Sequence, residues 1–263
     1  MGAFGMDYYW AHVNSTTMPL RYSDFNIGKN LRTNKDAIIE KRDWLGTDKE
    51  LLNKTIAKDC DGIIAGLYEY QVCYQPFFPD KTKFIPFPII TEGKKTQVEK
   101  KGGVLKLFIG ISKNRSEYKG TDIMLRAAEA VKAKYPERLD LRIAEGIPFD
   151  QYVKLMDGSD AILDQLYSYT PSMNPLEAMS RGIICIGGGE PENYEILNET
   201  QLHPIINVLP TYESCYEQIK QLVLHPERIQ KLQQESIDYI RKHHDHIKVA
   251  KQYESFYKAI LTK

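Results

Sequence analysis

Short apolar runs alternate with amphipathic helical patterns through the second half of the chain, and this alternation constrains the fold most. Helical patterns cover Gly120–Lys134 and Phe149–Met156. The apolar runs predict five strands, at Val104–Ile111, Leu139–Ala144, Asp160–Leu163, Ile183–Ile186 and Ile205–Leu209. Strands that alternate with helices imply right-handed crossovers and a parallel sheet buried on both faces. We therefore expect an α/β domain whose ligands lie beyond the carboxyl ends of its strands.

The segment Tyr169–Glu190 carries the most specific signal for a binding site. Asn174 is a good N-cap, and Pro175 suits the first turn of a helix because its missing N–H would have no partner there. The start of such a helix attracts anions. Glu177 follows one turn later and can accept hydrogen bonds from hydroxyl groups. A phosphate site beside a carboxylate is what a sugar nucleotide needs.

Basic residues follow the first of these strands. Lys113, Arg115 and Lys119 stand between the strand and the next helix, at the expected ligand edge of the sheet. A solvated loop is the ordinary explanation for such side chains, and the choice between it and a ligand site depends on the resemblance given below. Asp164, which follows the third strand, could contact a ligand or could shape its loop.

The segment resembles the donor site of retaining glycosyltransferases of the GT-B type, in particular those of family 4. Their pattern is Glu, seven residues, Glu, then Ala-Met-x-x-Gly, a strand and a small-residue loop. Glu177-Ala178-Met179 with Gly182 matches, and so does Gly187-Gly188-Gly189-Glu190. Tyr169 stands where the family has the first glutamate. The role of Tyr169 therefore stays open.

This resemblance implies a Rossmann-like parallel-sheet C-terminal domain of the GT-B type and a transferase that uses a UDP- or GDP-sugar. It implies diphosphate binding by Lys119 together with Lys113 or Arg115, and ribose binding by Glu177. It does not identify a catalytic residue. Further candidates for the donor-site loops are Asp164, Tyr169, Met173, Asn174, Gly188 and Gly189.

The acceptor is expected to be a glycan or a lipid-linked glycan, since such enzymes commonly build bacterial surface polysaccharides. We expect a cytoplasmic protein that could associate peripherally with the inner face of the membrane. The alternative is a non-catalytic or truncated nucleotide-sugar-binding protein, which the tyrosine at position 169 and the short N-terminal region favour. A dehydrogenase fits less well, because no GxGxxG follows the first strand.

We expect four parts along the chain. Residues 1–90 read as a partial, acceptor-side α/β domain, and the polar segment 91–103 reads as a linker. Residues 104–245 form the nucleotide-sugar-binding domain, and the helix at 246–263 packs back toward the N-terminal domain. Within 1–90 only Gly2–Gly5, Asp61–Leu67 and Lys83–Pro88 suggest strands, so we expect this domain to be incomplete. The same region should hold a helix at Glu40–Lys58 and a loop at Arg21–Gly28, whereas helices at Tyr212–Leu224, Pro226–His243 and Ile247–Ile260 end the chain.

Composition excludes several classes of protein. The 263 residues include 35 basic and 35 acidic side chains, so a dedicated nucleic-acid binder is not expected. Neither a transmembrane run nor a P-loop is visible, and no cofactor is expected.

The four cysteines are widely spaced, which favours reduced thiols, with Cys185 buried as a small hydrophobe. His243, His244 and His246 lack acidic or cysteine partners at ligand spacing, so we expect no metal site.

Overall fold

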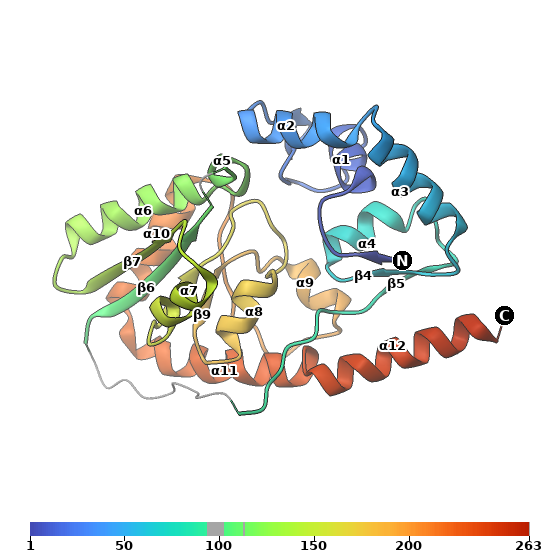
Figure 1. The fold of residues 1–263 in the computed structure, drawn as a ribbon. Coiled ribbons are helices and arrows are strands. Elements are labelled where there is room, and N and C mark those ends of the chain that lie inside the picture. The colour runs from blue at the N-terminus through green and yellow to red at the C-terminus, as the bar shows by residue number, and fades with distance from the viewer. Residues whose placement is uncertain (94–102, 113, 263) are drawn as a thin grey trace. The chain divides into compact units, whose positions relative to one another are not determined.

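The computed structural model describes residues 1–93, 103–112 and 114–262, and these fall into two compact units (Figure 1). Unit 1 combines Met1–Pro88 with His244–Lys263, and unit 2 is Ile89–His243. Most of the linker expected at 91–103 lies outside the described residues. The four-part division expected from the sequence stays a prediction. Within the described part of the chain, no helix combines the length and the apolar character that crossing a membrane requires.

Unit 2 is built on a parallel five-stranded sheet in the order β10-β9-β8-β6-β7. Its strands are β6 (Leu105–Ile111), β7 (Leu139–Glu145), β8 (Ala161–Leu163), β9 (Ile184–Gly187) and β10 (Ile206–Asn207). All five strands expected from the apolar runs are confirmed, with ends shifted by one or two residues. The α/β class and the parallel sheet are therefore as expected.

Helices cover both faces of this sheet (Figure 1). One face packs against α6 (Thr121–Lys134) and α10 (Tyr212–Leu224), and the other packs against α7 (Phe149–Met156) and α8 (Met173–Met179). Successive residues of β6 serve opposite faces, because Leu107 packs with the first group and Phe108 with the second. The remaining helices are α5 (Ser116–Lys119), α9 (Pro191–Ile196), a 3-10 turn (Pro226–Arg228) and α11 (Ile229–His243). The helix expected from Pro226 thus begins as this turn.

Unit 1 contains a parallel three-stranded sheet in the order β1-β4-β5. The strands β1 (Gly2–Ala3), β4 (Ile63–Ala65) and β5 (Thr82–Phe84) fall at or within one residue of the three places that the sequence suggests. Its helices are α1 (Tyr8–Ser15), α2 (Lys35–Trp44), α3 (Asp48–Asp59), α4 (Tyr68–Tyr74) and α12 (His246–Leu261). On α12, Val249 packs against Ile64 of β4 and against Ile85, which directly follows β5.

Two expectations for unit 1 are wrong in detail. The single helix expected at Glu40–Lys58 is divided into α2 and α3, because the chain leaves helical geometry at Leu45 and is still extended at Thr47, the N-cap position of α3. The loop expected at Arg21–Gly28 includes the strand β2 (Asn26–Ile27), which pairs with β3 (Asn30–Leu31) as a short antiparallel hairpin.

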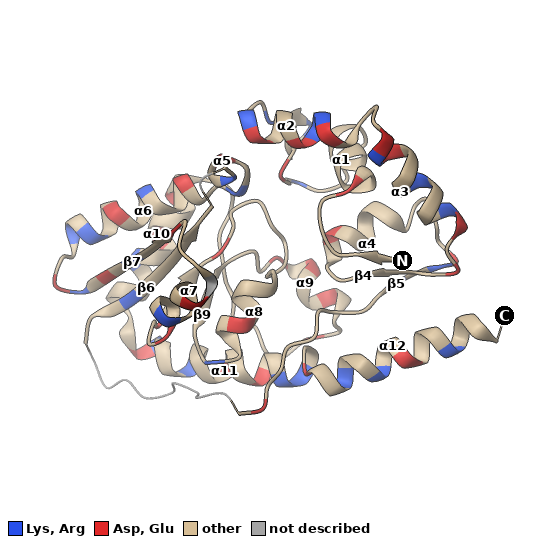
Figure 2. Ribbon diagram, viewed as in Figure 1, with Lys and Arg blue, Asp and Glu red and all other residues tan. Residues whose placement is uncertain are grey.

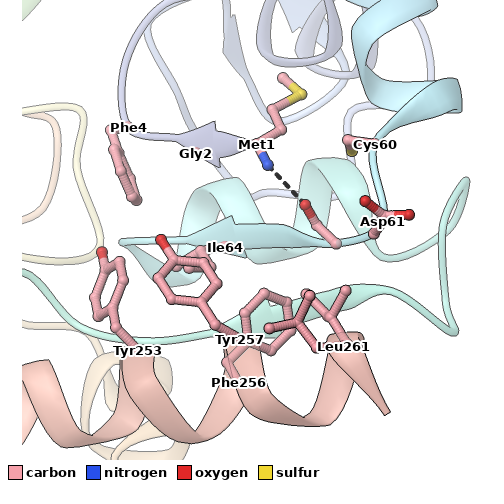
Figure 3. Close-up of a pocket in the computed structure, with 12 residues that line it drawn as sticks. Met1, Gly2, Phe4, Cys60, Asp61, Ile64, Tyr253, Phe256, Tyr257 and Leu261 are labelled. Carbon is pink, nitrogen blue, oxygen red and sulfur yellow. Dashed lines mark hydrogen bonds between the residues drawn. The ribbon is translucent and has the colours of Figure 1, made fainter. Parts of the chain in front are cut away.

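An apolar pocket of about 590 Å³ lies beside β1 in unit 1 (Figure 3). Phe4, Tyr253, Phe256 and Tyr257 supply its aromatic lining. Gly62 lets α12 approach β4 closely, since a Cβ atom there would lie 2.5 Å from Ile260 Cδ1. None of the residues expected at the functional site lines this pocket.

Charged residues of both signs are interspersed along the surface helices, as α6 and α12 show in Figure 2. This mixture agrees with the zero formal net charge of the chain. Sequence-independent attraction to nucleic acid would need a surplus of basic side chains.

Candidate functional site

The sheet of unit 2 has a topological switch point between β6 and β8. From β6 the chain crosses to β7 on one side, and β8 then pairs with β6 on the other side. Ligands of such sheets bind at the carboxyl ends of the strands that flank this change of direction. The loops that follow β6 and β8 are therefore the first place to look for a site. Both carry residues that the sequence analysis selected.

The loop after β6 presents one basic side chain clearly. Lys119 ends α5, and its ammonium group forms no ion pair within the described part of the chain. The guanidinium group of Arg115 lies 4.8 Å from the centre of the Tyr118 ring, so it packs on an aromatic face. Lys113 lies outside the described residues. The choice between Lys113 and Arg115 as the partner of Lys119 stays open.

The loop after β8 is hydrogen-bonded to the loop after β6 and to the loop after β9. The backbone N–H of Leu166 donates to the carbonyl of Lys119 over 2.8 Å. On the other side, the N–H of Glu190 donates to the carbonyl of Tyr169 over 3.1 Å. Tyr169 itself is only 1% exposed, so most of its side chain is inside unit 2. Three loops at the carboxyl edge are thus held together by backbone hydrogen bonds.

Gly188 allows the closest of these approaches. A Cβ atom at this position would lie 2.3 Å from the carbonyl oxygen of Ser168 and 3.0 Å from the amide nitrogen of Thr170. At Gly189 the added atom would lie 2.7 Å from the Cγ2 atom of Ile205. Backbone atoms cannot move aside as the end of a flexible side chain can. Gly188 is therefore needed for packing, whatever it contacts in a ligand.

We expect Gly188→Ala to destabilise unit 2 by about 3 kcal/mol, at the upper end for overpacking, because its new methyl group meets backbone rather than side chain. Urea unfolding followed by far-UV circular dichroism would measure this loss. Gly5→Ala is the control, since a Cβ at Gly5 meets nothing within 4 Å. Equal stability of the two variants would show that the loop after β8 moves aside easily.

Asn207, on β10, supports the third loop and was not selected from the sequence. Its side-chain carbonyl accepts a hydrogen bond of 3.0 Å from the N–H of Gly189, and its amide nitrogen donates to Glu190 Oε1 over 3.0 Å. Glu190 is buried at 5% exposure. Nothing in the local sequence signals this partnership, because Asn207 lies 17 and 18 positions away from the residues that it holds.

Tyr152 links the carboxyl end of β6 to helix α7. Its ring covers Gly110, where a Cβ atom would lie 2.6 Å from the ring carbon Cε2. Burial raises the pKa of Tyr152 to about 12, and the negative charge of Asp164 adds to the effect. The phenol therefore stays protonated at neutral pH. Asp164 also accepts a hydrogen bond of 3.3 Å from the hydroxyl of Ser172, which places it beside the start of α8.

Helix α8 begins earlier than the sequence suggested. Ser172 is the N-cap, so Asn174 lies inside the first turn and the expectation of an Asn174 cap is wrong. Pro175 becomes the third residue of the helix, where its missing N–H is still harmless because the first four N–H groups have no partner within a helix. Ser172 makes no side-chain capping bond to the helix, so its hydroxyl is available to Asp164.

A cleft of about 630 Å³ separates α7 from α8. Three residues selected from the sequence line it, namely Met173, Asn174 and Glu177. Tyr152 lines it as well, so the cleft extends to the side chain that covers the end of β6. Its volume is within the range of small-molecule sites. The structure does not bring all candidates into this cleft, since Lys119, Tyr169, Gly188 and Gly189 belong to the loops at the sheet edge.

Glu177 and Arg181 form an ion pair on the wall of this cleft. Arg181 donates to Glu177 Oε1 from Nε over 3.1 Å and from Nη2 over 2.9 Å. Arg181 was missed from the sequence, although its spacing of four residues from Glu177 would have predicted the contact on a helix.

The three histidines near residue 245 do not gather around one point. His243 bonds to the carboxylate of Glu199, whereas Nδ1 of His244 lies 2.9 Å from the carbonyl oxygen of Phe87. Among the residues that the structure describes, no group of three His, Cys, Asp or Glu side chains is arranged to hold a metal ion. All four cysteines are unpaired thiols, and Cys185 is fully buried.

Comparison with known proteins agrees with this arrangement. Residues 114–255 match the family described as glycosyl transferase-like. No curated protein sequence matches the chain. Sucrose-phosphate synthase from Thermosynechococcus elongatus has a similar structure, with a TM-score of 0.60 at 13% identity over 82% of this chain and 62% of that protein.

Two further solved structures contain a nucleotide. TarM from S. aureus, in complex with Fondaparinux, alpha-GlcNAc-glycerol and UDP, gives a TM-score of 0.59 at 13% identity, over 80% of this chain and 46% of TarM. HepE from Anabaena, in complex with UDP and glucose, gives 0.59 at 13% identity, over 80% of this chain and 66% of HepE. At such identities the likeness shows the fold, which is that of GT-B proteins, and the chain spans about half to two thirds of their length.

Proposed function

The chain belongs to the glycosyl transferase-like family, whose match spans more than half of its length, and we propose that it transfers a sugar from a nucleotide-sugar donor to an acceptor. The observation that carries this proposal is the cleft between α7 and α8. It has the size of a small-molecule site, Glu177 is on its wall, and Tyr152 connects it to the end of β6 where the basic loop begins. The nucleoside would occupy the cleft, with the diphosphate toward Lys119.

The chemistry of sugar transfer explains why these groups suit the task. Breaking the bond between the sugar and a nucleoside diphosphate leaves negative charge on the β-phosphate. A fixed cation near that phosphate stabilises the charge as it develops, with no need for the protein to reorganise. Lys119, in the loop after β6 at the switch point of the sheet, would supply this cation. The carboxylate of Glu177 would accept hydrogen bonds from the ribose hydroxyls.

We propose a UDP- or GDP-sugar as the donor, in part because the TarM and HepE structures hold UDP. Asp164, Tyr169, Met173, Asn174, Gly188 and Gly189 would shape or contact the donor site. The acceptor would be a glycan or a lipid-linked glycan, bound by unit 1, as in the synthesis of a bacterial surface polysaccharide. Action in the cytoplasm, with peripheral association at the inner face of the membrane, belongs to the same proposal.

Calorimetric titration with UDP, GDP and ADP tests the donor site, and incubation with the corresponding sugar nucleotides tests transfer and hydrolysis. We expect micromolar to millimolar binding of one uridine or guanosine diphosphate, the range common for enzyme substrates. Failure of all three nucleotides to bind would overturn the proposal. Binding without any turnover would favour the non-catalytic alternative.

We expect Glu177→Ala to weaken binding of the nucleoside diphosphate about tenfold or more, because a hydrogen bond to a charged group contributes about 1.5–3 kcal/mol. Isothermal calorimetry would measure the change. Glu129→Ala is the matched control, since Glu129 is an exposed carboxylate on α6. If a folded Glu177→Ala variant keeps its affinity, Glu177 does not contact the ribose.

A further inference from the structure

The Glu177–Arg181 pair differs from an ordinary pair on a helix surface. Salt bridges between exposed side chains contribute little, because each long side chain loses rotamer freedom to form them. Here both side chains line the cleft, and they are only 30% and 23% exposed. Both hydrogen bonds from Arg181 end on the same carboxylate oxygen, Oε1. The two contacts thereby hold Oε1 of Glu177 at one place on the cleft wall.

The backbone that carries Arg181 is itself held in place. The helix ends at Met179, and the N–H of Arg181 donates to the carbonyl of Ala178 over 2.9 Å. Gly182 follows with φ of 83°, a left-handed conformation that ends a helix and that glycine adopts without strain. Arg181 therefore projects from a turn that other residues fix, and it can serve as a rigid support for the glutamate.

We propose that Arg181 is a positioning residue that holds the Glu177 carboxylate in the orientation that accepts the ribose hydroxyls of the donor. This inference rests on the proposed function. A glutamate side chain that must be ordered upon binding reduces affinity, whereas one that is already ordered does not. Arg181 removes this cost before the nucleotide arrives. This cost returns when Arg181 is removed. We therefore expect Arg181→Ala to weaken UDP binding about three- to tenfold.

A thermodynamic cycle separates this role from simple attraction between a cation and a diphosphate. UDP affinity is measured by calorimetry for the wild type, Arg181→Ala, Glu177→Ala and the double variant. If Arg181 acts through Glu177, the loss caused by Arg181→Ala disappears in the Glu177→Ala background. Lys154→Ala removes another cation from the same cleft, and its effect should be equal in both backgrounds.

Two further readouts report on the ribose. The loss in Arg181→Ala should be smaller with 2′-deoxy-UDP, which has one hydroxyl fewer for the carboxylate to bind. In a transfer assay Arg181→Ala should raise KM for the donor with little change in kcat, since the contact is made equally in the ground state and in the transition state. Arg181→Lys keeps the charge, and it should recover part of the affinity in the Glu177 background only.

The outcomes are distinguishable. If Glu177→Ala leaves UDP affinity unchanged, the ribose contact of the proposed function fails, and this inference fails with it. If Glu177→Ala weakens binding but Arg181→Ala weakens it equally in both backgrounds, Arg181 acts directly on the ligand, and only the positioning role is overturned. Tighter UDP binding in Arg181→Ala would show that the arginine keeps the carboxylate away from the ligand. This result would also overturn the positioning role. Circular dichroism of each variant confirms that it is folded.

Discussion

Lys119→Ala should lower kcat for sugar transfer about 10²- to 10³-fold, the loss typical for removing one group that stabilises charge in a transition state. The leaving diphosphate gains charge as the sugar departs, so the contact strengthens in the transition state, and KM should rise much less than kcat falls. Steady-state kinetics with the sugar nucleotide that the wild type turns over would measure both constants.

A matched control exists on the helix that follows. Lys134 is an exposed lysine at the far end of α6, near the amino edge of the sheet, and Lys134→Ala should keep kcat within about twofold because surface changes away from a site have small effects. We expect Arg115→Ala to have a smaller effect than Lys119→Ala, since the guanidinium group packs on Tyr118. Unchanged kcat in Lys119→Ala would show that the loop after β6 is ordinary surface.

A second large effect, this time on stability, is expected at Glu199, whose side chain is fully buried in unit 2. The carboxylate accepts hydrogen bonds from Lys242 over 2.7 Å and from His243, both at the end of α11. Two backbone N–H groups, of Gln201 and Leu202, also donate to it. Burial alone raises the pKa of Glu199, but these hydrogen bonds outweigh burial and hold the pKa well below its ordinary value.

We expect Glu199→Ala to lower the free energy of unfolding by about 3 kcal/mol, the lower end of the range for breaking a buried pair, because Lys242 remains half exposed. Because the pKa of Glu199 is lower in the folded protein, its contribution to stability depends on pH. The stabilisation is present above the pKa of an unfolded glutamate, about 4.3, and is lost as pH falls through the folded pKa. Glu199→Gln should therefore remove part of the acid sensitivity of the wild type.

Urea unfolding between pH 3 and pH 7 would test this, with far-UV circular dichroism as the probe. Tryptophan fluorescence is unsuitable, because both tryptophans, Trp10 and Trp44, belong to unit 1. Glu195→Ala, at an exposed carboxylate four residues earlier, serves as the control. Equal stabilities of Glu199→Ala and this control would show that the buried cluster contributes nothing net.

The sheet of unit 2 was predictable because its signals are local. Residues 107–109 and Ile183–Ile186 are short, continuous apolar stretches, as is typical of strands buried on both faces of a parallel sheet. The helix after residue 172 was harder to place, because Ser172 and Asn174 are both good caps and proline is tolerated throughout the first turn. The structure has Ser172 as the cap, and its hydroxyl donates to Asp164, a residue outside the helix and eight positions earlier.

The candidate site was predictable only in part, for the same reason. Glu177 stands in a motif, and Arg181 stands at helical spacing from it, so local patterns can find both. Asn207 holds Gly189 and Glu190 from another strand, and the cleft exists because α7 and α8 cover the same face of the sheet. Such contacts are set by packing between distant elements. A single sequence does not state them.

Unit 1 is built from two distant stretches of the chain, and this affects the order in which the protein folds during synthesis. Val249 and Phe256 of α12 pack on Ile64 and Ile85, which the ribosome makes long before them. All of unit 2 is made in between and can fold as it emerges, since domains generally fold as units during translation. The amino-terminal strands, although they are made first, are therefore among the last parts of the protein to be covered.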